Sequence, residues 1–298
     1  MFKKILVTTC VIASLSTGSA FAAPATSPSQ VKEGFGAKIE DDTERQARSA
    51  VITQIMAASG MDELMEQLPA LVAMGMDQSP PPPVESDVLE KFRTTVLQSF
   101  DSTRTRPMLV RFFEQRYDNR RYTEIVAMLD TPLAKKMTAL ELQAQTPEAQ
   151  QEMMQFANSM LSQPSPQRLA LVERIDQVQR ATESMVELQV MMASAVMKNM
   201  NQIVPVEQKL TDEQMTQMLE QMREQSLSPA RQFMQLSMVY TYRSLPDNEL
   251  EEYVQLQEST VGRYTNDLLR ESVINLFDGI SVELANHIGQ MFKANNAL

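Results

Sequence analysis

Residues 110–137 read VRFFEQRYDNRRYTEIVAMLDTPLAKKM, and this stretch decides the fold because a related stretch follows 128 positions later without a gap. The shift places Phe112 on Tyr240 and Tyr122 on Leu250. Further along, residue type is kept at Glu124/Glu252, Val126/Val254, Met128/Leu256, Asp130/Glu258, Thr131/Ser259, Leu133/Val261, Ala134/Gly262 and Lys135/Arg263. We therefore predict a duplicated helical unit. We expect its core to contain Phe112, Tyr122, Val126, Met128, Tyr240, Tyr253, Val254 and Leu256.

The first copy also resembles a family of exported bacterial proteins. An acid-led amphipathic helix at residues 124–129 is followed by Thr131-Pro132, a small residue and the basic pair Lys135-Lys136. This order is similar to the core of domain of unknown function 2059. The second copy departs from it, since Thr260 stands at the proline position. The resemblance implies an all-helical exported fold and brings no activity with it.

The rest of the sequence also favours an all-α fold. Sustained two-residue alternation of apolar and polar residues is missing, the chain has only 8 glycines, and it has no Asn-Gly hairpin dipeptide. We therefore predict a helical bundle built from two related helical halves. The expected divisions are a signal peptide at 1–22, a disordered segment at 23–43, a first half at 44–163 and a second half at 164–298.

The N-terminus predicts export. Lys3 and Lys4 precede an apolar run from Ile5 to Leu15, and Ala20-Phe21-Ala22 suits a signal peptidase. The only cysteine, Cys10, lies in the removed segment, so the mature chain would have neither disulfides nor thiolate metal sites. We expect a periplasmic protein, with secretion beyond the envelope as an open alternative.

Charge and hydropathy narrow the classes of partner. The chain has 27 basic and 38 acidic residues and a net charge of −11, and removal of Lys3 and Lys4 makes this charge two units more negative. Such a chain repels nucleic acid, so we expect none as a partner. After the signal peptide, no apolar run is long enough to predict a transmembrane segment. A protein or another envelope component remains the expected partner, and a homo-oligomer stays open.

Several local signals predict helix boundaries. Gly60 and Pro69 should divide the region after Glu44 into two helices or one kinked helix, and the prolines at 80–83 should form a stiff connector. Pro107 should open or bend a helix, and new helices should begin at Thr131-Pro132, Thr146-Pro147 and Ser228-Pro229.

Three signals in the second half concern its longest helices. A seam with alternating four- and three-residue steps predicts one long helix from Leu171 to Val196, the longest of the fold. Thr211 and Gln214 form a capping-box pattern at a helix start. Asp278-Gly279 should stop or bend a helix before the last one.

Catalysis is the least favoured class of function. The only histidine, His287, lies between Leu284 and Ile288 on a helical pattern, and no Gly-x-Ser-x-Gly elbow supplies a nucleophile. The acids Asp247, Glu249, Glu251 and Glu252 fit a solvated turn, where nothing would separate their pKa values. We therefore expect no enzyme and no cofactor. An envelope hydrolase ranks third, after a binding protein and a metal-handling protein.

Methionine is unusually abundant, at 23 residues with no tryptophan. Most of these side chains lie on apolar stripes, so core packing explains them most simply. Two alternatives remain: a methionine-lined surface for apolar partners, and a periplasmic Cu(I) site, since thioethers bind this soft cation. The Cu(I) alternative would use Met191, Met192, Met197 and Met200.

The charge pattern gives the most specific functional hypothesis. Arginines crowd the first copy of the repeat, with Glu114 and Asp118 among them: Arg104, Arg106, Arg111, Arg116, Arg120 and Arg121. One interpretation is an anion- or partner-binding segment at Arg111, Arg116, Arg120 and Arg121. The favoured interpretation is neutralisation by acids of the same chain or of a second subunit. We expect a binding or scaffold protein of the cell envelope in either case.

Overall fold

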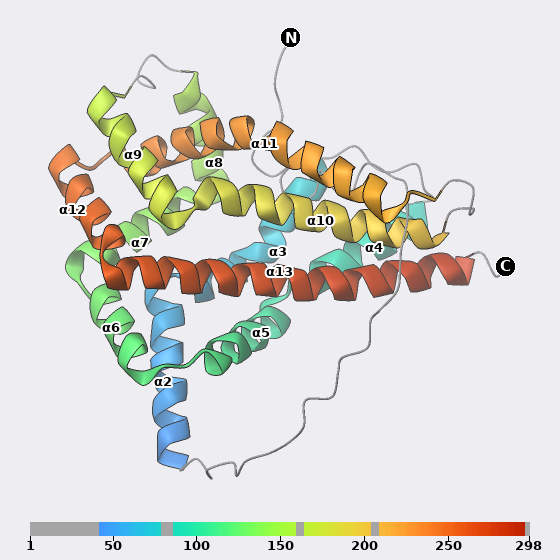
Figure 1. Cartoon of the computed structure of the whole chain (residues 1–298), viewed down its shortest axis with the longest axis horizontal. Coiled ribbons are helices and arrows are strands. Elements are labelled where there is room, and N and C mark those ends of the chain that lie inside the picture. Colours follow the sequence, from blue (N-terminus) through green and yellow to red (C-terminus); the bar gives the residue numbers. More distant parts are fainter. Residues whose placement is uncertain (1–41, 79–85, 159–163, 204–208, 296–298) are drawn as a thin grey trace.

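The computed structural model describes residues 42–78, 86–158, 164–203 and 209–295, and within these ranges the chain forms helices and no strands (Figure 1). The predicted all-α class is therefore confirmed. The predicted signal peptide, most of the segment 23–43 and the prolines at 80–83 lie outside the described residues. Inside these ranges, no helix combines the length and apolar character that crossing a membrane requires.

The first two helices meet at a glycine. The helix α2 (Asp42–Ala58) begins two residues before the expected start at Glu44, and α3 (Met61–Gln78) follows it. Gly60 separates them with a φ of 74°, a conformation that is costly for residues with a side chain. The predicted break at Gly60 is therefore confirmed, whereas Pro69 lies inside α3.

The second helix of the next pair begins earlier than Pro107 suggested. The helices are α4 (Ser86–Ser99) and α5 (Ser102–Gln115). Asp101 caps α5, because its carboxylate accepts a hydrogen bond from the backbone N–H of Thr103 at 2.9 Å. Pro107 therefore does not open this helix. It lies within α5, where its exposed ring faces away from the core.

Three short helices follow, and local capping chemistry fixes the start of each. They are α6 (Asn119–Leu129), α7 (Pro132–Ala144) and α8 (Pro147–Ala157). Thr131 and Thr146 cap α7 and α8 through their hydroxyl groups, and a proline occupies the first turn of each helix. Both predicted restarts are therefore confirmed.

The predicted long helix from Leu171 to Val196 is wrong. The structure has α9 (Pro166–Gln179) and α10 (Ala181–Ile203), separated at Arg180, which adopts a left-handed φ of 53°. The Asp176 carboxylate accepts hydrogen bonds from the backbone N–H and hydroxyl of Thr182 at 2.8 and 2.6 Å. These bonds cap the start of α10. The apolar seam therefore continues through two helices.

Helix α11 (Asp212–Thr241) begins as the sequence predicted and continues where the sequence predicted a restart. Thr211 and Gln214 form the complete capping box. Ser228-Pro229 does not start a new helix, so that prediction is wrong. Pro229 is exposed, and Ala230 beside it packs into a small core with Val186 of α10. This burial holds the helix together through the proline, and Figure 1 shows α11 bending part-way along.

The last two helices are α12 (Asp247–Glu258) and α13 (Thr260–Asn295), and α13, not the seam after Leu171, is the longest described element. The predicted stop at Asp278-Gly279 is wrong, because α13 continues through both residues. Phe277 and Ile280 on either side are buried, and packing keeps this part helical. A Cβ at Gly279 would lie 2.6 Å from the Cε of Met108, so glycine allows α5 to approach closely.

Two main cores hold the helices together. Core 1 lies where α2–α6 pack against α13 and one turn of α10, and its buried members include Ile52, Ile55, Met56, Phe100, Leu109, Phe113, Tyr122, Ile125, Phe277 and Ile280. Core 2 joins α7, α9, the end of α11 and α12 through Met137, Leu171, Val172, Ile175, Met238, Val239, Tyr242, Leu245, Leu250, Tyr253 and Val254. Core 1 thus draws on both predicted halves.

The helices of the two copies of the repeated sequence start at matching positions. Helices α6 and α12 begin at Asn119 and Asp247, and α7 and α13 begin at Pro132 and Thr260, so both pairs keep the 128-residue shift. The turn is also the same. In the first copy the hydroxyl of Thr131 donates to the carbonyl of Met128 and accepts from the N–H of Ala134. Ser259 makes the corresponding bonds with Leu256 and Gly262. Duplication as their origin stays a prediction.

Candidate functional site

Three arginines lie over aromatic rings and define what we call the arginine–aromatic face. Arg48 of α2 lies over Tyr117, with 5.8 Å between guanidinium carbon and ring centroid. Arg116, at the end of α5, lies 4.8 Å from the centroid of Phe112, and Arg121 of α6 lies 4.5 Å from that of Tyr264 in α13. Each such contact contributes about 0.5–1 kcal/mol at an exposed site. The face therefore joins four helices at the surface.

Tyr122 lies beneath this face and fixes its geometry. The residue is fully buried, and its hydroxyl donates a hydrogen bond of 2.9 Å to the carbonyl of Phe113. Its ring packs edge-on against Phe113 and Tyr117. Burial raises the pKa of the Tyr122 hydroxyl, and the neighbouring Tyr264 raises it further, so Tyr122 stays a neutral donor. The turn between α5 and α6 is thereby held rigid.

Acids of the same chain neutralise most arginines of this segment. Arg104 pairs with Glu283 at 2.5 Å, Arg106 with Asp62 at 2.9 Å, Arg116 with Glu271 at 2.6 Å and Arg120 with Glu124 at 3.0 Å. Three of these four pairs connect α5 or its end to α3 or α13. The structure therefore favours the internal role for these four arginines.

Two of the four predicted binding residues have a different environment. Arg121 is exposed and stacks on Tyr264, and Arg111 is exposed on α5. Among the described residues, neither has a carboxylate within ion-pair distance. These two side chains are the cationic groups of the segment that remain available to a partner.

Replacing Arg116, Arg120 and Arg121 together by Ala should lower the free energy of unfolding by about 1–2 kcal/mol. The loss should come mainly from Arg116, which loses both Glu271 and its stack on Phe112, and from Arg121, which loses its stack on Tyr264. Thermal melting and mass in solution would measure stability and oligomeric state. An unchanged melting temperature together with an unchanged mass would contradict a structural role.

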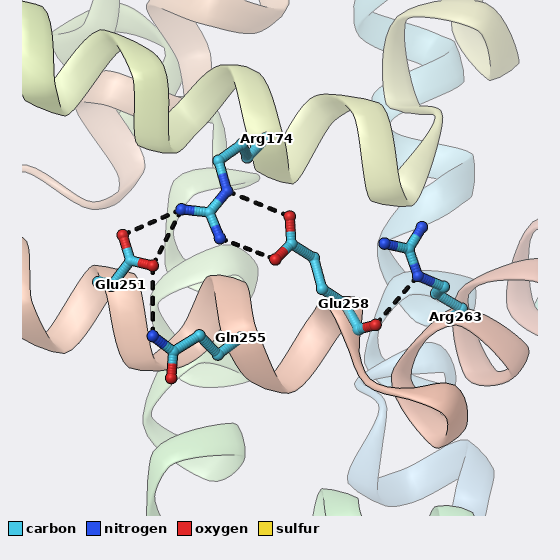
Figure 2. Close-up of polar contacts among 5 residues, drawn as sticks. All are labelled: Arg174, Glu251, Gln255, Glu258 and Arg263. Atoms are coloured by element: carbon cyan, nitrogen blue, oxygen red, sulfur yellow. Dashed lines mark hydrogen bonds and ion pairs between the residues drawn. The ribbon is translucent and has the colours of Figure 1, made fainter.

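Asp247, Glu249 and Glu251 are used in ion pairs, contrary to the expectation of a solvated turn, whereas Glu252 is exposed as expected. Figure 2 shows Arg174 of α9 between Glu251 and Glu258 of α12. Its guanidinium group donates to Glu251 at 2.9 and 3.0 Å and to Glu258 at 3.1 and 2.7 Å. The hydrogen bonds from Arg174 lower the pKa of the Glu258 carboxyl. Arg174 therefore clamps α9 to α12.

Two more basic residues hold the start of α12. Lys136 of α7 pairs with Glu249 at 2.5 Å. Arg168 of α9 pairs with Asp247 at 2.7 Å, and its guanidinium group also donates to the carbonyls of Tyr242 and Leu245. These acids were candidates for acid–base chemistry, but their contacts tie α12 to its neighbours instead.

A carboxylate that no sequence motif pointed to lies among tyrosines. Glu141 of α7 accepts hydrogen bonds from the hydroxyls of Tyr242 at 2.6 Å and Tyr253 at 2.8 Å. Burial raises the pKa of its carboxyl, whereas the two hydroxyls lower it. Helical spacing could have found this residue, because Glu141 follows the buried Met137 and Ala134 by four and seven positions on one helix face.

A second tyrosine–glutamate pair borders a small pocket. The Tyr240 hydroxyl donates to Glu152 of α8 at 2.7 Å, and Arg243 lies 3.7 Å from the centroid of the Tyr240 ring. The pocket measures about 120 Å³ and lies between α7, α8 and the end of α11. Its Glu148 and Glu152 carboxylates are partly balanced by Arg243. This volume accepts a few water molecules or the tip of a side chain.

The repeat residues and the methionines serve mainly in packing. All eight predicted core residues of the repeat are buried or partly buried. Met191 and Met192 pack into core 1, and the Met192 sulfur accepts a hydrogen bond from Ser281. Met197 instead lines a pocket of about 220 Å³ with Met215 and Leu219, and the side chain of Met200 is not among those described. The Cu(I) alternative stays a prediction.

The described residues add no candidate catalytic residue and no candidate metal ligand to those named from the sequence. His287 belongs to α13, but its side chain lies outside the described part. In the described ranges, no three His, Cys, Asp or Glu side chains gather as a metal site would require. No family model, curated protein or solved structure matches this chain. The resemblance to domain of unknown function 2059 therefore stays a prediction.

Proposed function

We propose that this chain is an exported helical binding or scaffold protein of the cell envelope, without catalytic activity, and that the arginine–aromatic face contacts its partner. The stacking of Arg48, Arg116 and Arg121 on aromatic rings supports the proposal most strongly. Protein interfaces are enriched in arginine and aromatic residues, because aromatic rings offer large contact areas at a low cost in conformational entropy and the guanidinium group donates several hydrogen bonds from one plane.

Charge adds a second argument for this face. The chain is acidic overall, with a net charge of −11, yet α5 and α6 display Arg111 and Arg121 without a carboxylate partner among the described residues. Guanidinium groups bind carboxylates and phosphates through paired hydrogen bonds. A partner with an anionic surface therefore suits Arg121 of this face and Arg111 of α5. Location in the envelope rests on the N-terminal signal pattern.

The test compares two double variants of the exported protein. Arg111→Ala with Arg121→Ala removes the two available cations, whereas Arg223→Ala with Arg231→Ala removes the same charge from α11. We expect the first variant to recover at least tenfold less partner from a periplasmic extract, with the second close to wild type. Melting curves should show that both variants remain folded. Equal recovery by the two variants would contradict this function.

A further inference from the structure

Glu141 lies where three helices meet, away from the arginine–aromatic face. It projects from α7 toward Tyr242, which caps the end of α11, and toward Tyr253 of α12. Both tyrosines belong to core 2 and are almost completely buried, with 2% and 3% of their surfaces exposed. Glu141 is partly buried as a residue, and its carboxylate reaches into this core.

Hydrogen bonds to hydroxyl groups are the main support for a negative charge at this position. The two tyrosine hydroxyls and burial are the influences that act on the pKa of Glu141, and they act in opposite directions. Burial, and after it the Glu141 charge, raises the pKa of both tyrosines, which keeps them protonated as donors. A buried carboxylate that has only neutral donors is costly, because water no longer solvates the charge.

Nearby charged groups are engaged elsewhere. On α7 itself, Lys135 pairs with Asp130 at the end of α6, and Lys136 pairs with Glu249 of α12. Charged groups on the other elements around α7 and core 2 also have partners of their own. Glu152 of α8 contacts Tyr240 and Arg243. Arg168 of α9 pairs with Asp247, and Glu251 of α12 pairs with Arg174. Glu148 of α8 faces the small pocket between α7 and α8. None of these cations contacts the Glu141 carboxylate.

We infer that Glu141, Tyr242 and Tyr253 form an acid-strengthened joint, which is tight when the Glu141 carboxyl is protonated and looser when it is ionised. Protonation removes the buried charge and leaves the carboxyl among hydroxyl groups with which it can still share hydrogen bonds. Ionisation weakens the packing of α7 against α11 and α12. The device is independent of the arginine–aromatic face and would make the rigidity of core 2 respond to pH.

The sign of the pH dependence follows from the direction of the shift. Because the folded-state pKa of Glu141 is raised, the folded protein binds more protons than the unfolded chain at pH values between the two pKa values. The contribution of Glu141 to stability is therefore greatest below the unfolded pKa of about 4.3 and falls as pH rises through the folded pKa. Carboxyls with lowered pKa values, such as Glu258, act in the opposite direction.

Comparison of the wild type with Glu141→Gln isolates this contribution, because an amide keeps an acceptor oxygen for the tyrosines and cannot ionise. At pH 8 the variant should melt about 2–4 °C above the wild type, and the difference should shrink toward zero near pH 5. Amide hydrogen exchange in α7 and α12, corrected for intrinsic rates, should be faster in the wild type at pH 8 only. Glu152→Gln, at the more exposed pair, should show no such pH-dependent difference.

A direct titration keeps the proposal testable if Glu141→Gln folds poorly. Carbon-13 spectra of glutamate carboxyls in the wild type should contain one resonance that titrates at a higher pH than the others. This resonance should be absent from the spectra of Glu141→Gln and Glu141→Asp. Observation of that group ionising at or below the pH of the exposed glutamates would overturn the joint. A difference in melting temperature that stays constant from pH 5 to pH 8 would also overturn it.

Discussion

Replacement of Arg168 by Ala is expected to lower the free energy of unfolding by about 3–5 kcal/mol. Only 15% of this side chain is exposed, and its guanidinium group holds three acceptors at the turn between α11 and α12. It donates to the carbonyl of Tyr242 at 3.0 Å and to that of Leu245 at 2.5 Å, and it pairs with Asp247 at 2.7 Å. The variant would leave all three without this donor at a poorly solvated site.

Urea unfolding at pH 7 would measure the loss, and two further variants define its origin. Arg120→Ala removes an exposed pair within one helix and should change the free energy of unfolding by less than about 0.5 kcal/mol. Arg168→Lys keeps the charge but cannot reach all three acceptors from one planar group, so it should recover only part of the loss. A loss below about 1 kcal/mol for Arg168→Ala would show that the turn is held by other contacts.

Gly262→Ala should have the second largest effect, a loss of about 3 kcal/mol in the free energy of unfolding. A Cβ at this position would lie 2.2 Å from the carbonyl oxygen of Leu256 and 2.6 Å from that of Gln257. Both atoms belong to the backbone of α12, so relief of the clash requires α12 and α13 to separate. That movement would also stretch the hydrogen bond from the Gly262 N–H to the Ser259 hydroxyl, now 3.0 Å.

Gly279→Ala is the matched control within the same helix. Its Cβ would meet only the terminal methyl of Met108, which can rotate away. Alanine also has the higher helix propensity, by about 1 kcal/mol, so this control should be nearly neutral or stabilising. Thermal melting of the two variants would compare them directly. Equal stability of Gly262→Ala and Gly279→Ala would mean that the turn between α12 and α13 adapts without cost.

Basic residues from other helices bind α12 in addition to its packing in core 2. Arg168 and Arg174 of α9 and Lys136 of α7 bind four acids along α12, namely Asp247, Glu249, Glu251 and Glu258. The excess of acids in the second copy is therefore partly a packing requirement. Arginines in the first copy have the same role toward α3 and α13, which leaves Arg111 and Arg121 as the residues for the proposed contact.

Part of the fold could be read from local sequence, because the responsible interactions span only a few residues. Thr131 and Thr146 each accept a hydrogen bond from an N–H three positions later, and Gly60 alone supplies the positive φ between α2 and α3. Capping and turn energies of this kind act before any tertiary contact forms. For the same reason the Thr211–Gln214 capping box was predictable.

Only part of the candidate site could be predicted from the sequence. The arginine cluster is visible in the sequence, but the Tyr264 ring that Arg121 contacts comes from α13, and Arg48, which stacks on Tyr117, comes from α2. Glu141 escaped notice because an isolated glutamate in a helix is normally solvated. Its spacing from the buried Met137 was the one signal in the sequence, and the approach of Tyr242 and Tyr253, more than 100 residues away, comes from the tertiary structure.

The sequence by itself determined the all-helical class and several capped helix starts, because periodicity and capping are properties of neighbouring residues. Tertiary structure decided where helices end or continue against those signals. The Asp176–Thr182 contact divides α9 from α10, whereas burial around Ala230 and Phe277 carries α11 and α13 through Pro229 and Gly279. Tertiary packing also decided which charges remain free, because ion pairing depends on distances between side chains that only folding brings together.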